Sequence, residues 1–293
     1  MDMIETERTI DEAIEIAATT FNTTLIDWQR AIYATFQSGR PREAAQLANV
    51  VLQHWPMHLS TYQLMLQIAW KLDLWQEGAD WARRLLRSDP GNGLAWRSLA
   101  RAAEESGERA PASAIWQRAF EAQPYDSAVR AGIMRTTLDH ADALVLNLAS
   151  LASIRLRSRS WKHASATYRH LVQTEPRRSD FQIAYMVSLW QQGATQEAYR
   201  WARHLSSMNR HLIMPWVVLH ETGDENDKAL AQNPLSVMDP NRSFLRSWLG
   251  APQQYEAITE KDQDHQDDRP TVDFDVELDD FVLLEAAELA LDL

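Results

Sequence analysis

The stretch GLAWRSLARAAEESG, residues 93–107, decides the fold. Its apolar side chains, Trp96 among several alanines, recur at the spacing of one face of a helix. Gly107 then permits a sharp turn, because glycine adopts backbone angles that other residues avoid. Pro111 follows at a tolerated first-turn position, and Pro124 cannot continue the helix that begins there. The stretch therefore predicts the first half of a helical hairpin.

Copies of this hairpin recur along the chain. Small residues before the expected second helix are spaced 34, 34, 52 and 34 residues apart, and other columns keep the same register. A fixed period of this length indicates stacked units, since one hairpin cannot bury its own apolar face. The small column holds Ala44, Gly78, Ala112, Ala164 and Ala198; the turn column holds Gly39, Asp73, Gly107, Arg159 and Gly193; the end column holds Pro56, Pro90, Pro124, Pro176 and Arg210.

A 34-residue unit of this kind resembles the tetratricopeptide repeat (TPR) family. The copy at 93–126 carries the resemblance most fully, through Trp96, Leu99, Ala100, Ala103, Gly107, Ala112, Trp116, Ala119 and Pro124. The resemblance implies an all-α, right-handed superhelical solenoid of helix-turn-helix repeats. In 93–126 we expect helices at about 94–105 and 111–122, with most of the 12 Trp residues filling the core.

The columns divide the chain into segments. Unit boundaries follow the repeat register, and the odd spacing of 52 leaves 18 residues that begin as a first helix and then lack a recognisable second one. We expect an N-terminal capping helix in 1–24, three TPR-like repeats in 25–126, an odd helix or degenerate repeat in 127–144, two repeats in 145–212, closing helices in 213–250, a disordered acidic linker in 251–271 and an acidic amphipathic tail in 272–293.

Charge is distributed unevenly over these segments. Residues 255–293 hold 14 acidic and 2 basic side chains, a net charge of −12, whereas residues 25–254 carry about +5. A body this weakly basic argues against nucleic-acid binding, which needs a concentrated basic stripe. The absence of Cys fits a reducing cytoplasm, and the sequence shows neither a signal peptide nor an apolar run long enough to span a membrane.

The resemblance also implies a binding surface, because the family's ligands usually lie against the first helices on the concave face. This predicts a groove of mixed aromatic, amide and basic character, suited to an acidic or amphipathic peptide. A solvated helix face is the competing interpretation of the two arginines. The predicted groove residues are Gln29, Tyr33, Gln63, Gln67, Trp70, Lys71, Arg97 and Arg101.

The acidic tail combines apolar and charged residues in two patterns. Residues 272–278 alternate strictly, including Phe274, and the segment from Asp279 onward, with Phe281 and Leu284, is suited to an amphipathic helix. Such a segment needs a surface to cover it. It docks on the chain's own body, binds another protein, or stays solvated.

Motifs for chemistry are missing. There is no Gly-rich phosphate loop, no G-x-S-x-G and no H-E-x-x-H. His54 and His58 are four residues apart, but no third ligand lies near them in the sequence, which argues against a metal site. We therefore expect no cofactor and no catalysis.

The sequence predicts a non-catalytic scaffold or adaptor that binds a peptide or partner segment, with its own tail as a competitor for the groove. The alternative is a regulatory or assembly subunit of a larger enzyme complex.

Overall fold

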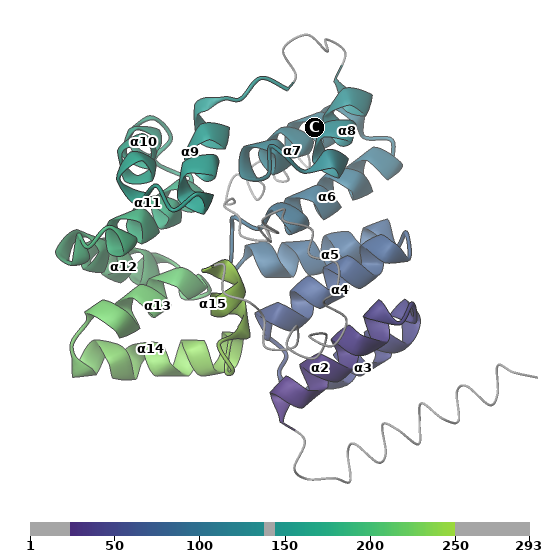
Figure 1. The fold of residues 1–293 in the computed structure, drawn as a ribbon, viewed down its shortest axis with the longest axis horizontal. Helices are drawn as coiled ribbons and strands as arrows, with labels where there is room; N and C mark the ends of the chain where they lie inside the picture. Colours follow the sequence, from purple (N-terminus) through teal and green to yellow (C-terminus); the bar gives the residue numbers. More distant parts are fainter. Residues whose placement is uncertain (1–23, 138–143, 250–293) are drawn as a thin grey trace, which may run out of the picture.

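The structure, a computed structural model, describes residues 24–137 and 144–249 of the chain (Figure 1). Throughout these residues the fold is α-helical, with no β-strand, which confirms the predicted all-α array of helical hairpins. The capping helix predicted in 1–24, the linker 251–271 and the tail 272–293 lie outside the described residues. No helix in the described part has the length and apolar character needed to cross a membrane.

The described residues form fourteen helices, most of them in antiparallel pairs. The hairpin at 93–126 has helices close to the predicted ranges. The bounds are α2 Leu25–Gln37, α3 Pro41–His54, α4 Leu59–Lys71, α5 Trp75–Leu86, α6 Gly93–Glu105, α7 Arg109–Ala122, α8 Ser127–Thr136, α9 Leu148–Arg157, α10 Trp161–Thr174, α11 Ser179–Gln191, α12 Thr195–Met208, α13 Ile213–Thr222, α14 Glu225–Met238 and α15 Ser243–Trp248.

The turn column has one backbone conformation in all five units. Its φ angles are positive: +81° at Gly39, +80° at Gly107, +90° at Gly193, +55° at Asp73 and +57° at Arg159. Glycine adopts this left-handed conformation without steric cost, and Asp tolerates it better than most residues. The turn between the two helices of a unit therefore requires this geometry even where no glycine supplies it.

The small column lies where the two helices of a unit cross. Its four alanines are fully buried, and a Cβ added to Gly78 would lie 3.5 Å from the Ala69 Cβ of the preceding helix. Large residues fill the space between units: Trp96 and Trp116 are fully buried. The other Trp residues are buried or partly buried against the core, which confirms the structural interpretation of these side chains.

The units form two stacks rather than one continuous row. The first stack comprises α2–α8 and the second comprises α9–α14; in Figure 1 the first rises on the right and the second descends on the left. The change of direction follows α8, because α9 packs against α7 instead of continuing beyond α8. Helix α8 is thus a first helix that lacks a second helix of its own among the described residues; it lies in the segment 127–144, for which an odd helix or degenerate repeat is predicted.

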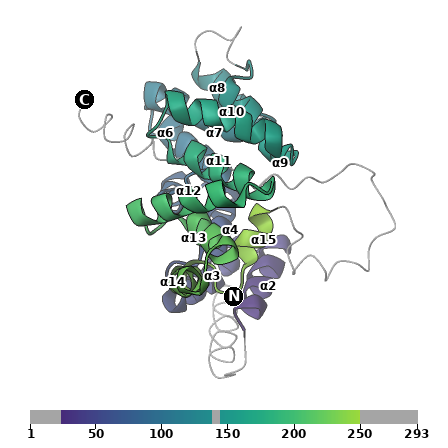
Figure 2. The same ribbon diagram turned by 90° about the vertical axis from the view of Figure 1, so that its left-hand side faces the viewer.

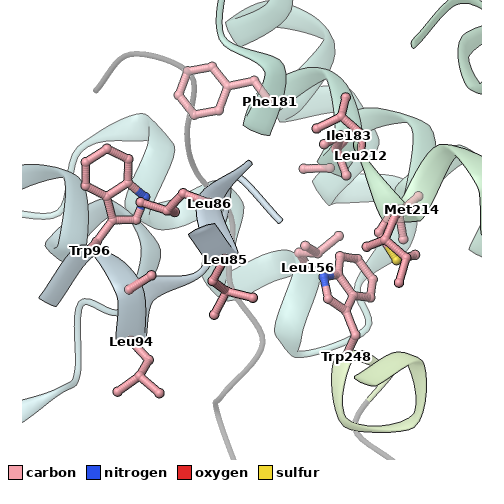
Figure 3. Close-up of a cluster of buried hydrophobic side chains, with 14 of the residues drawn as sticks. Leu85, Leu86, Leu94, Trp96, Leu156, Phe181, Ile183, Leu212, Met214 and Trp248 are labelled. Atoms are coloured by element: carbon pink, nitrogen blue, oxygen red, sulfur yellow. The ribbon is translucent and has the colours of Figure 1, made fainter. Parts of the chain in front are cut away.

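The stacks meet through the connections that lead from one unit to the next. The backbone N–H of Ile213 donates to the carbonyl of Ser88 at 3.0 Å, which joins the start of α13 to the α5–α6 connection. Apolar side chains from both stacks converge around this contact (Figure 3). They include Leu85, Leu86, Leu94, Trp96, Leu156, Phe181, Ile183, Leu212, Met214 and Trp248.

Two helical glycines provide a test of packing inside the first stack. A Cβ at Gly132 in α8 would lie 2.2 Å from the Trp116 ring, whereas one at Gly78 meets only ordinary van der Waals contact. We predict that Gly132→Ala lowers the free energy of unfolding by about 1–3 kcal/mol through overpacking. Gly78→Ala should raise it by up to about 1 kcal/mol, because alanine favours the helix.

Urea unfolding followed by circular dichroism measures both changes. Equal stabilisation of the two variants would contradict the close contact between α8 and α7.

Candidate functional site

The predicted groove residue Gln29, near the start of the described chain, faces a later segment of the same chain. Residues 239–249, here called the clasp, return from α14 and pack α15 against α4 (Figure 2). The Asn241 side-chain amide donates to Gln29 Oε1 at 2.6 Å, and the Gln29 amide donates to Ser243 Oγ at 3.2 Å. Ser243 and Ser60 share a hydrogen bond of 2.6 Å. Gln29 is therefore occupied within the chain.

The clasp has a folded turn of its own. Asp239 accepts from the backbone N–H groups of Phe244 and Leu245 at 3.0 and 2.9 Å, which fixes the start of α15. Phe244 and Trp248 are then buried. Full burial of one such side chain stabilises a fold by about 1.5–3 kcal/mol. Arg159 of the second stack donates to the carbonyl of Leu249, so the clasp contacts both stacks.

A buried histidine lies under the clasp. The His58 ring makes a 2.7 Å hydrogen bond with Thr61 Oγ1. Burial lowers the pKa of His58 to about 4, against the opposing effect of a hydrogen bond with Asn241. The ring is therefore neutral near pH 7. The described residues hold no group of three His, Cys, Asp or Glu side chains arranged for a metal ion, and His54 bonds instead to the Val50 carbonyl.

Farther along the first stack, arginines stack on tryptophans. The Arg97 guanidinium lies 4.3 Å from the centre of the Trp70 ring, and Arg101 lies 5.0 Å from that of Trp75. The two tryptophans meet edge to face, 5.2 Å apart. Three predicted groove residues, Trp70, Arg97 and Arg101, are therefore brought together. Trp75 belongs to the same surface and was missed, because it begins a second helix rather than lining a first one.

Carboxylates hold the arginines in place. Arg97 pairs with Asp126 at 2.7 Å, and Arg101 pairs with Glu105 at 2.5 Å. Glu104 accepts from both Arg135 nitrogens at 2.5 and 3.0 Å and from the Trp116 indole at 3.0 Å. Burial opposes ionisation of Glu104, but the hydrogen bond and charge of Arg135 prevail and keep its pKa below the usual value.

These residues form a single surface, which we call the Arg–Trp strip. Leu74, an exposed apolar residue, lies between its two tryptophans in the chain. The arginine side chains are partly exposed, at 19% for Arg97, 25% for Arg101 and 45% for Arg135. The strip comprises Trp70, Leu74, Trp75, Arg97, Arg101, Glu104 and Arg135, and it lies over the buried Trp116.

The other groove residues differ in their exposure. Gln63 is buried, Gln67 and Tyr33 are half-buried, and Lys71 is exposed beside Trp70 in the sequence. The predicted tail residues Phe274, Phe281 and Leu284 lie outside the described residues.

A buried ion cluster joins the stacks near α8. Arg178, between α10 and α11, donates to Asp180 at 2.7 Å and to Glu121 at 3.1 Å, while Arg118 pairs with Glu121 at 3.0 Å. Burial raises the pKa of Glu121 to about 7 despite the nearby Arg118, and it raises that of Asp180 as well. Two arginines therefore face three carboxylates, because Arg178 also pairs with Glu175 at 3.4 Å, and the Arg178–Glu121 pair links the two stacks.

Comparison with known proteins gives the following matches. No family model matches this chain, and no curated protein matches it. A solved structure of Naa15/Naa10 bound to HypK-THB aligns with 82% of this chain at 12% identity and a TM-score of 0.28; this chain spans about 37% of the matched chain. A tetratricopeptide repeat protein from Parabacteroides merdae aligns with 84% of this chain and 90% of its own, at 11% identity and a TM-score of 0.34.

The contact between the stacks predicts a pH dependence. Asp89 is buried in the α5–α6 connection and accepts from Asn92 at 3.1 Å. Burial raises the pKa of its carboxyl from 3.8 to about 7. The folded state then holds the proton more tightly than the unfolded state. The stability that this proton contributes is present below about pH 4 and is lost as the pH rises to about 7.

We predict that Asp89→Asn removes this contribution to the pH dependence. As the pH rises from about 4 to about 7, the free energy of unfolding of the unaltered chain should fall relative to that of the variant. The fall should be up to about 1.4 kcal/mol per pH unit. Urea unfolding at several pH values tests this, with the exposed Asp80→Asn as the control. Parallel stability profiles for all three proteins would contradict the prediction.

Proposed function

We propose that this chain is a non-catalytic protein-interaction scaffold and that the Arg–Trp strip is its contact surface. The observation that supports this most strongly is the stacking of Arg97 on Trp70 and of Arg101 on Trp75 at a partly exposed surface. Tryptophan and arginine are enriched among the residues that dominate binding energy in protein interfaces. The exposed Leu74 adds an apolar contact at the same place.

The strip is held in place before a partner arrives. Each arginine is fixed by a stacked ring on one side and a carboxylate on the other. A surface whose long side chains are already ordered loses less conformational entropy on binding than one with free side chains.

The charges on this surface favour one kind of partner. Arg97, Arg101 and Arg135 are matched by Asp126, Glu105 and Glu104. A purely acidic peptide would have to displace these carboxylates. An amphipathic segment that presents apolar side chains to Trp70, Leu74 and Trp75 would leave them in place. We therefore narrow the expected partner from acidic or amphipathic to amphipathic, bound at the strip rather than at Gln29.

The test is quantitative affinity capture with the full chain, followed by binding measurements on the partner that is recovered. Trp75→Ala and Arg101→Ala should each weaken the affinity by roughly 30-fold, the effect of losing a dominant interface residue. Leu230→Ala, a change at an exposed apolar residue of α14 in the second stack, serves as the matched control and should leave the affinity unchanged.

Equal affinity of all three variants would refute the strip as the contact surface. A partner that binds as an isolated peptide supports a peptide-binding adaptor. A partner that binds only as a folded enzyme subunit would instead indicate the assembly-subunit role.

A further inference from the structure

Helix α8 exposes a residue that the five predicted repeats bury. In the 34-residue register, Met134 of α8 is equivalent to Ile32, Leu66, Ala100, Ala152 and Met186. All five equivalents are fully buried, whereas Met134 is 39% exposed. The five belong to units that have a second helix, and α8 has none among the described residues. The exposed face of α8 is therefore the face that a second helix covers elsewhere.

Apolar residues gather around this helix. Nine large hydrophobic residues are exposed in the described part of the chain, and five of them fall within residues 125–148. They are Tyr125, Met134, Val145, Leu146 and Leu148. Such a concentration at one break in the array indicates a surface that another segment covers.

The sequence of the second helices contains a short motif. It reads EAAQLA at 43–48 in α3, EGADWA at 77–82 in α5 and EAYRWA at 197–202 in α12. In each, the second and sixth residues are buried against the unit's first helix; in α3 these are Ala44 and Ala48. Val51, the next residue on that face, is also buried. The fourth motif residue, which is Gln46 in α3, is exposed to solvent.

The same pattern occurs twice more in the sequence, as EAIEIA at 12–17 and in the acidic tail, and the tail copy is the nearer match to α3. Residues 285–290 read EAAELA, which differs from the α3 copy only at Glu288 in place of Gln46. In this register Ala286, Ala290 and Leu293 match the buried residues of α3. Residues 279–293 are 15 in number, sufficient for a second helix, and Asp279 or Asp280 provides a cap.

We propose that residues 279–293 form the missing second helix of the α8 unit and dock in cis on the exposed face of α8. Ala286 and Ala290 then pack against Met134, as the alanines of α3 pack against α2. Leu293 and neighbouring apolar residues cover the exposed hydrophobic patch. The inference does not depend on the Arg–Trp strip being a contact surface, because it is argued from Met134 and the tail motif, although Arg135 of the strip lies on the same helix.

Length and charge are compatible with this docking. The 29 residues of 250–278 have a typical end-to-end distance of about 30 Å as a flexible chain, compared with a radius of gyration of about 17 Å for a compact body of this size. Exposed Arg130 and partly exposed Arg135 lie on α8, and the tail segment carries Glu285, Glu288 and Asp292. The two segments therefore carry opposite net charges, which favours their association without requiring a specific ion pair.

Amide hydrogen exchange of the full-length chain tests the proposal. Ala286→Gln with Ala290→Gln places long side chains on the packed face, whereas Glu285→Gln with Glu288→Gln places the same residue on the outward face. The first pair should speed exchange in residues 127–136 and 279–293 by at least about tenfold. The second pair should leave exchange in both segments near that of the unaltered chain.

A change on the α8 side provides a second test. Met134→Asp should speed amide exchange of 279–293, as Ala286→Gln with Ala290→Gln does. Leu74→Asp, a change at a residue with the same 39% exposure, should leave that exchange unchanged. Rapid exchange of 279–293 in the unaltered chain, with no effect of any variant on α8, would overturn the proposal. Protection that disappears on dilution would also overturn it, because it would show docking between two copies.

Discussion

The fold depends on the contact between its two stacks along the connections that join successive units. A helical hairpin buries one face within its own unit and a second against its neighbours in the stack. The helix ends that flank each connection remain apolar and need a third surface to bury them. They carry residues such as Leu85, Leu86 and Phe181. The two stacks supply that partner for each other, with the clasp filling the space between them at the carboxyl end (Figure 3).

This arrangement separates two surfaces. The connections after the second helices face inward, where Ser88 meets Ile213 and Glu121 meets Arg178. Trp70, Leu74 and Trp75 lie at the opposite end of a hairpin, at the turn between α4 and α5. These three strip residues therefore lie away from the contact between the stacks, whereas Gln29 is covered by the clasp. A scaffold built this way can bind a partner without separating its stacks.

The repeat columns were sufficient to predict the hairpins, because each column has a local physical cause. A left-handed turn selects Gly39 and Gly107, and a close helix crossing selects Ala44 and Ala112. Trp70, Arg97 and Arg101 were predicted as groove residues from the family resemblance rather than from a repeat column. The irregularity at 127–144 was visible as a spacing of 52, and a degenerate unit there predicts a bend of the stack, but not that the two stacks pack against each other.

The clasp could not be predicted, because its contacts span the whole chain. Asn241 and Gln29 are 212 residues apart, and neither belongs to a motif. The Arg178–Glu121 contact is similar, since each residue reads as an ordinary surface charge until the two stacks bring them together. Periodicity constrains neighbouring units, whereas the folding back of the array depends on pairs of residues that no column connects.

The closure of the array is tested most directly by a disulfide between Ser60→Cys and Ser243→Cys. Their hydroxyl oxygens are 2.6 Å apart, and the chain contains no other cysteine. The structure predicts nearly complete disulfide formation within one molecule under mild oxidation, an unchanged helical spectrum, and a gain of about 2–4 kcal/mol in stability. Ser60→Cys with Ser236→Cys, at an exposed site of α14, should stay reduced. Free thiols in the first pair, or links only between separate molecules, would show that the two ends of the array do not meet.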